Sequence, residues 1–168
     1  EVIEAKWLFD LAVDQIEVLV HPQSIVHSMV AFDDGAVKAQ LGVPDMKVPI
    51  QYALSYPARW PAPHERLDWS SLSRLDFQRP NVEKFPCLRL AYEALEAGGT
   101  APAVLNAANE VAVQRFLDED IGFADIPRAV EAVLERQPLQ SEPSLEGLVR
   151  ADARARERTE ELALPVRN

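Results

Sequence analysis

The sequence predicts an α+β fold in which a short mixed or antiparallel sheet with helices is linked to a C-terminal four-helix bundle. Three observations support this prediction. Residues 16–41 contain short runs rich in Val and Ile between turn residues, which is typical of strands. Residues 57–81 contain four prolines and little periodicity, as in an extended linker. From residue 82 onward apolar residues recur at helical spacing, so the predicted parts are 1–56, 57–81 and 82–168.

The first predicted element is an amphipathic helix over residues 1–14. Ile3, Trp7 and Leu11 recur every four residues and would lie on one side of this helix. The helical pattern begins at Glu1 without an N-cap residue, and no initiator methionine precedes it. We therefore expect the sequence to be a fragment that was cut inside or just before a helix.

Three short strands and a helix are predicted next. The apolar run 16–20 reads as a first strand, which ends at Pro22 because proline cannot donate a backbone hydrogen bond. The polar stretch 21–29 would then connect this strand to the next. Residues 29–41 alternate around an Asp-Asp-Gly turn and predict an antiparallel hairpin. A short helix over 48–56 is expected to stop at Pro57.

Glycine and proline residues that end helices divide the C-terminal part into four predicted helices. Leu88, Ala91 and Leu95 form one apolar face that ends at Gly98-Gly99. The remaining three helices are expected over residues 102–117, 125–136 and 145–164. Short loops between four helices favour a small bundle.

The composition argues against several function classes. The formal net charge of −10 speaks against nucleic acid or an anionic membrane as a partner, because a phosphate backbone favours clustered Lys and Arg. The single cysteine, Cys87, excludes an internal disulfide. No apolar run approaches the roughly 18 residues of a membrane span, and no signal peptide opens the chain.

Polar chemistry is concentrated in residues 21–29, which hold two of the three histidines, two serines and a glutamine. His21 and His27 lack the helical spacing of a metalloprotease zinc site. The serines lack the Gly-x-Ser-x-Gly context of a hydrolase nucleophile. By themselves these residues therefore indicate a functional segment without identifying its reaction.

Several blocks taken together resemble one family closely. They are residues 1–9, 21–29, 34–42, Pro44-Asp45-Met46, Phe85-Pro86-Cys87-Leu88 and 106–113. In this order along the chain they resemble the 1-deoxy-D-xylulose 5-phosphate reductoisomerase family. Residues 57–81 and the last twenty or so residues fit this pattern only loosely.

The resemblance implies the conversion of 1-deoxy-D-xylulose 5-phosphate to 2-C-methyl-D-erythritol 4-phosphate in the non-mevalonate isoprenoid pathway. Such an enzyme uses NADPH and a divalent metal, Mg²⁺ or Mn²⁺, and is a homodimer in the bacterial cytoplasm or in plastids; we expect the bacterial location. Residues 1–56 would be the C-terminal part of a catalytic α/β domain, 57–81 a linker and 82–168 the C-terminal helical domain. The sequence has no Gly-rich loop of a dinucleotide-binding domain, so no cofactor-binding residue is predicted.

Three site residues follow from the resemblance. Glu1 corresponds to a metal-ligand carboxylate that also contacts the substrate. His27 corresponds to a residue beside that carboxylate and the substrate, where a histidine can orient a carboxylate or share its proton. Met46 corresponds to part of the apolar wall near the substrate. The alternatives are a solvated charge at Glu1, a structural histidine at His27 and ordinary core packing at Met46.

Two functions of different class remain open from the sequence. In the first, the chain is part of a reductoisomerase and is inactive alone, because the cofactor domain, further metal ligands and phosphate-binding residues are missing. In the second, it is a non-catalytic module that dimerises or serves as a scaffold.

Overall fold

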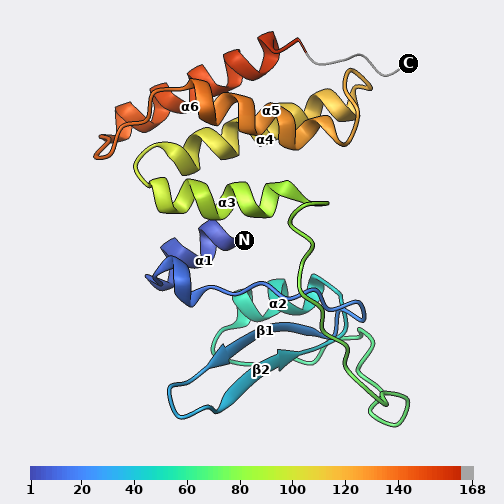
Figure 1. The fold of residues 1–168 in the computed structure, drawn as a ribbon. Helices are drawn as coiled ribbons and strands as arrows, with labels where there is room; N and C mark the ends of the chain where they lie inside the picture. The colour runs from blue at the N-terminus through green and yellow to red at the C-terminus, as the bar shows by residue number, and fades with distance from the viewer. Residues whose placement is uncertain (164–168) are drawn as a thin grey trace. The chain divides into compact units, whose positions relative to one another are not determined.

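The computed structural model describes residues 1–163 and confirms the predicted α+β class. Within those residues it contains six α-helices and one two-stranded antiparallel sheet. The chain forms two compact units (Figure 1). The helical unit combines residues 1–18 with the described residues from Pro80 on, and the sheet unit comprises Leu19–Arg79.

Four long helices dominate the helical unit. Its elements are α1 (Val2–Phe9), a 3₁₀ turn (Val13–Gln15), α3 (Pro86–Ala97), α4 (Ala101–Leu117), α5 (Asp125–Arg136) and α6 (Leu145–Glu161). Helix α4 contacts α3, α5 and α6, so it is the central member of the predicted four-helix bundle (Figure 1). None of the helices in residues 1–163 is both long and apolar enough to span a membrane.

Small side chains on α4 form the centre of the core. Val104, Ala107 and Ala108 are fully buried and pack in one cluster with residues from three other helices. Those partners are Leu90 of α3, Val130 and Val133 of α5, and Ala151 and Ala155 of α6. Because alanine adds little bulk, the neighbouring helices can pack closely against α4 without voids.

The helix boundaries follow the stop signals in the sequence. Helix α3 begins at Pro86, where a missing N–H costs nothing, and Gly98 caps its end with a φ of 66°. Helix α5 occupies the predicted range, and α6 starts after Ser144, whose hydroxyl accepts the Gly147 N–H at 3.2 Å. The predicted end of the last helix at residue 164 lies outside the described residues.

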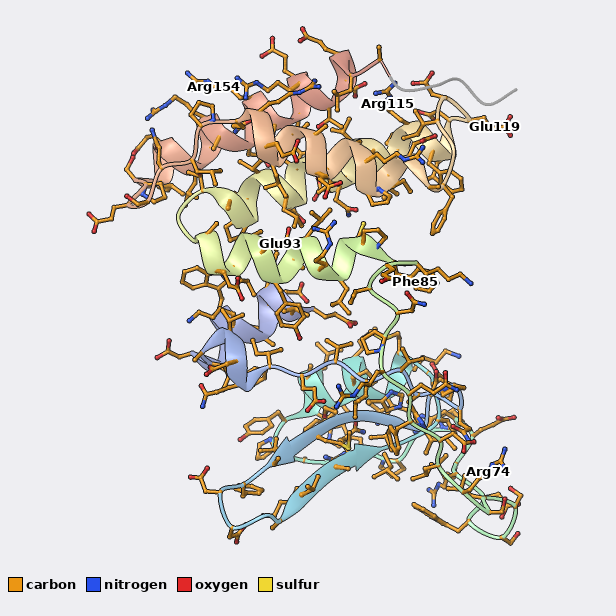
Figure 2. The ribbon with its side chains drawn as sticks, in the orientation of Figure 1. Arg74, Phe85, Glu93, Arg115, Glu119 and Arg154 are labelled. Carbon is orange, nitrogen blue, oxygen red and sulfur yellow. The ribbon has the colours of Figure 1, made fainter. Side chains whose placement is uncertain are left out.

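The C-terminal end of α6 is held by a side chain from α4. The Arg115 guanidinium donates to the carbonyl oxygens of Thr159 at 2.8 Å and Leu162 at 3.0 Å (Figure 2). It also pairs with Asp120 at 2.8 Å, although its own side chain is only 13% exposed. These bonds satisfy carbonyls that a helix end leaves without intrahelical donors.

The sheet unit contains the predicted hairpin. Strand β1 (Val26–Ala31) pairs antiparallel with β2 (Val37–Leu41), and helix α2 (Lys47–Ser55) follows. At the turn, Gly35 adopts a φ of 84° and the Asp34 carboxylate accepts the Ala36 N–H at 2.9 Å. The turn thus forms as predicted: Gly35 adopts the positive φ, and the Asp34 side chain binds the backbone of the turn.

The predicted first strand over residues 16–20 is wrong. Of these residues only Val20 makes a strand-like contact, an isolated bridge to Gln78 with reciprocal N–H···O bonds of 2.9 Å. The Ile16 carbonyl instead accepts the Tyr92 hydroxyl at 2.9 Å. Consequently the stretch 21–29 is not a connection between two strands, and its last four residues belong to β1.

The N-terminal helix is also shorter than predicted. It ends at Phe9, because Asp10 turns into the left-handed region at a φ of 52°. Helix α1 packs against α3, so the compact units divide the chain differently from the predicted parts 1–56, 57–81 and 82–168. The domain boundaries of a longer protein stay a prediction.

Residues 57–79 contain no regular helix or strand and are attached by polar bonds. The Gln23 amide donates to the Asp76 carboxylate at 2.6 Å, and its oxygen accepts the Asp76 N–H at 3.2 Å. The His21 ring stacks on Phe77 with centroids 4.7 Å apart. Both tryptophans of this segment, Trp60 and Trp69, are exposed.

We predict that Gly99→Ala destabilises the helical unit more than Gly98→Ala does. Both glycines have positive φ values, of 54° and 66°, but a Cβ at Gly99 would lie 1.8 Å from the Gln140 carbonyl oxygen, whereas Gly98 has open space. The left-handed backbone should cost each variant about 1–3 kcal/mol, and the backbone clash adds to this only at Gly99. Urea unfolding measures both losses, and a smaller loss for Gly99→Ala would contradict the packing described.

Candidate functional site

Glu1 presents a free carboxylate at the start of α1. Its side chain is fully exposed, while its carbonyl oxygen accepts the Ala5 N–H at 2.8 Å in the first helical turn. The charged amino group of Glu1 lies 3.6 Å from the Glu4 carboxylate. The Glu1 carboxylate is therefore accessible to a cation.

His27 lies on β1 beside the segment that follows β2. Its Nε2 lies 3.2 Å from the Gly42 carbonyl oxygen, which can only accept a hydrogen bond. Nε2 must therefore carry the proton in this contact, and Nδ1 is the free acceptor of the neutral ring. The Gly42 N–H in turn donates to the Ile25 carbonyl at 2.9 Å, which fixes the backbone that receives the ring.

The His27 ring does not require a glycine at position 42. A Cβ at this position would lie 3.8 Å from His27 Nε2, an ordinary van der Waals distance. The strand pairing is irregular between Val26 and Ser28, at the position of His27. Such irregularities re-aim side chains next to functional sites.

Met46 lies at the N-cap position of α2 and its side chain is 70% exposed. Asp45 accepts the Lys47 N–H at 2.9 Å and thereby orders the start of the helix. Met46 is four residues beyond Gly42, so one short turn carries both Met46 and the carbonyl that holds His27. Its exposure excludes the core-packing alternative within this chain.

The three predicted site residues are distributed over both units. Glu1 belongs to the helical unit, whereas His27 and Met46 belong to the sheet unit. In residues 1–163 no group of three or more His, Cys, Asp or Glu side chains could hold a metal ion. The Glu1 carboxylate is a hard oxygen ligand that suits Mg²⁺ or Mn²⁺, but such an ion needs further oxygen ligands.

Sequence reasoning missed the turn residues that position the site. Gly42 and Asp45 follow the predicted hairpin in the sequence, and no role toward His27 was expected from them. The Gly42 contact joins residues 15 positions apart. A glycine directly after a predicted strand was the only available signal. His21 has a structural role, because its Nδ1 lies within hydrogen-bonding distance, 2.7 Å, of the Asp76 carbonyl oxygen.

Comparison with known proteins finds reductoisomerases of the family named in the sequence analysis along nearly the whole chain. The family model described as the DXP reductoisomerase C-terminal domain matches residues 41–158. The 1-deoxy-D-xylulose 5-phosphate reductoisomerase of Chloroherpeton thalassium is 60% identical over 93% of this chain and 40% of its own length. That of Heliobacterium modesticaldum is 58% identical over the same shares.

Solved structures agree with these relatives. The reductoisomerase from Zymomonas mobilis in complex with NADPH has a TM-score of 0.86 at 46% identity, covering 95% of this chain and 42% of that one. A DOX-P reductoisomerase in complex with NADPH, fosmidomycin and magnesium has a TM-score of 0.88 at 41% identity, covering 95% and 41%. The chain spans about 40% of the length of the curated relatives reported above. With a family model matched over most of its residues, the chain belongs to the DXP reductoisomerase family.

Proposed function

We propose that this chain is the C-terminal part of an NADPH- and divalent-metal-dependent reductoisomerase that converts 1-deoxy-D-xylulose 5-phosphate to 2-C-methyl-D-erythritol 4-phosphate. The observation that carries the proposal is the 60% identity to a reductoisomerase over 93% of the chain. The remaining length of such a protein would supply the cofactor domain and further metal ligands. The chain alone would then be inactive, because catalysis depends on groups held together in one site.

Each site residue has a role that its environment supports. Glu1 would supply one oxygen ligand to Mg²⁺ or Mn²⁺, for which its fully exposed carboxylate is suited. When bound, the metal would stabilise negative charge on the oxygens of the sugar phosphate. With Nε2 held by the Gly42 carbonyl, Nδ1 of the neutral His27 ring would accept a hydrogen bond from a substrate hydroxyl and so orient the substrate.

Met46 would form part of the apolar wall of the substrate site. Its side chain is 70% exposed although it is large and apolar, so a ligand or another part of the protein could cover it. A flexible thioether adapts its shape to the surface that it meets. It would exclude water from one side of the sugar phosphate.

The proposed setting is the bacterial cytoplasm, with a homodimer as the assembly and no nucleic acid or membrane partner. The net charge of −10 supports the absence of polyanionic partners. The non-catalytic scaffold alternative has no observation of its own in its favour, since the relatives and structures named above are reductoisomerases.

In the full-length enzyme, Glu1→Gln should lower turnover by roughly 100-fold or more, because it removes a charge that holds the metal while keeping the side chain's shape. The affinity for NADPH should barely change, because the cofactor would be held mainly by another domain. Steady-state kinetics over a Mg²⁺ series and a separate NADPH titration measure both effects.

Glu4→Gln is the matched control for Glu1→Gln, since Glu4 lies one turn along the same helix, is exposed, and loses the same charge. It should keep near-normal turnover. Near-normal turnover of Glu1→Gln at ordinary metal concentration would refute the assignment of Glu1 as a ligand.

The sheet unit also suggests where the proposed homodimer forms. Met29, Ala31, Val37 and Ala39 share one face of the hairpin, and all four are exposed. Val30 on the opposite face is exposed to the same extent as Val37, 57% against 58%, but only the face of Val37 is apolar at all four of these paired positions, since the other carries Lys38 and Gln40. A two-stranded sheet is only marginally stable alone, so a second copy covering this face and its edge would stabilise it.

We therefore expect the chain to self-associate at micromolar concentration, and Val37→Lys to weaken this by placing a charge on the apolar face. Val30→Lys is the control, because Val30 pairs with Lys38 on the opposite face, where a cation is already present. Light scattering coupled to size exclusion measures the masses. A monomeric wild-type chain with intact strand signal, or equal effects of both variants, would exclude this interface.

A further inference from the structure

The Gln40 side chain lies beside the His27 ring, over the backbone of Gly42. A Cβ placed on Gly42 would lie 3.7 Å from Gln40 Nε2 and 3.8 Å from His27 Nε2, so both side chains approach the same point. The next closest atom is His27 Cδ2, at 3.9 Å. Nε2 and Cδ2 form one edge of the imidazole, and Nδ1 lies across the ring from this edge. Gln40 is therefore a neighbour of the ring edge that Gly42 holds.

A β-bulge brings these two side chains together. Between Val26 and Ser28 strand β1 advances two residues, whereas their partners on β2 are adjacent in the sequence. His27 is the extra residue and has no partner in this register. Side chains alternate between faces in a regular strand, so His27 and Ser28 would point to opposite faces without the bulge. The bulge re-aims the His27 ring and allows it to lie near Gln40, the partner of Ser28.

The hydrogen bond from His27 Nε2 to the Gly42 carbonyl is open to solvent. It is 3.2 Å long and exposed. Water competes with exposed hydrogen bonds, so a contact of this kind gives little net stability by itself. If the bond opens, the proton can move to Nδ1, and the acceptor that the proposed function assigns to the ring is lost. A side chain that keeps water away from this bond would therefore preserve the functional tautomer.

The Gln40 amide is suited to this task. Its single hydrogen bond within residues 1–163 is a long one, from Nε2 to the Leu41 carbonyl at 3.5 Å. The side chain is thus not committed to another strong contact. An amide is also uncharged, whereas a carboxylate in its place would attract a proton to the His27 ring, and a protonated imidazole has no acceptor.

We propose that Gln40 is a positioning residue for His27 in the reductoisomerase reaction, where it shields the hydrogen bond between Nε2 and the Gly42 carbonyl from water. Nδ1 then stays unprotonated and can accept a hydrogen bond from a substrate hydroxyl. This role rests on the proposed function, because Gln40 acts only through the ring that orients the substrate. The bulge, the Gly42 carbonyl and the Gln40 amide together fix which ring nitrogen carries the proton.

Gln40→Ala in the full-length enzyme should lower kcat/KM for 1-deoxy-D-xylulose 5-phosphate roughly tenfold, since the loss of one oriented hydrogen bond has about this effect. The KM for NADPH should not change. Lys38→Ala is the matched control, because Lys38 lies on the same face of β2 two residues from Gln40, and its ammonium lies over the Phe32 ring. The control should stay within about twofold of the wild type.

A double-mutant cycle separates positioning from a general loss of stability. His27→Gln should lower kcat/KM, and Gln40→Ala should have no further effect in the His27→Gln enzyme, because Gln40 acts through the ring. The same loss in both backgrounds, or no loss in either, would overturn this inference alone. A normal kcat/KM of His27→Gln would instead refute the role of His27 in the proposed function, and this inference with it.

Nitrogen-15 NMR of the full 168-residue chain gives a readout that needs no activity, because the shifts of the ring nitrogens report the tautomer. At a pH where the ring is neutral, we expect His27 to be protonated at Nε2 in the wild type and to become a mixture of tautomers in Gln40→Ala. The His27→Gln chain assigns the signals. An unchanged tautomer in Gln40→Ala, or a proton on Nδ1 in the wild type, would contradict the proposed role of Gln40.

Discussion

The close packing of small side chains on α4 is the constraint on which the helical unit depends. Ala107, Ala108 and Ala112 have no exposed surface, so a larger residue at any of them would have to push a neighbouring helix outward. The same helix fixes the end of α6 through Arg115, and Thr100 at its N-cap fixes the segment after α5. These contacts fix the position of α6 against α4.

The proposed catalytic residues, unlike the core residues of α4, lie on the surface of their units. The Glu1 carboxylate and the Met46 side chain are open, and only the His27 ring is held, by the Gly42 carbonyl. A divalent cation needs more oxygen ligands than one side chain provides, and a substrate needs walls on several sides. Under the proposed function the chain would therefore supply only part of a larger site. This agrees with its span of about 40% of its relatives.

Local signals made most of the fold predictable, and long-range contacts account for the errors. Prolines and glycines at helix ends gave the boundaries of α3 and α5, and the Asp34-Gly35 turn gave the hairpin. The run 16–20 was mistaken for a strand because its possible partner, Gln78, lies far along the chain and pairs with Val20 alone. The site residues came from the family resemblance, whereas the Gly42 contact could not be inferred from sequence spacing.

The most direct test of the account asks whether this chain completes a reductoisomerase. The chain would be fused behind the part of the Chloroherpeton thalassium enzyme that it does not cover, and NADPH oxidation dependent on 1-deoxy-D-xylulose 5-phosphate would be measured with Mg²⁺ for the fusion and for the chain alone. The account predicts turnover by the fusion and none by the chain alone. Turnover by the chain alone, or a folded fusion that binds NADPH and remains inactive, would contradict it.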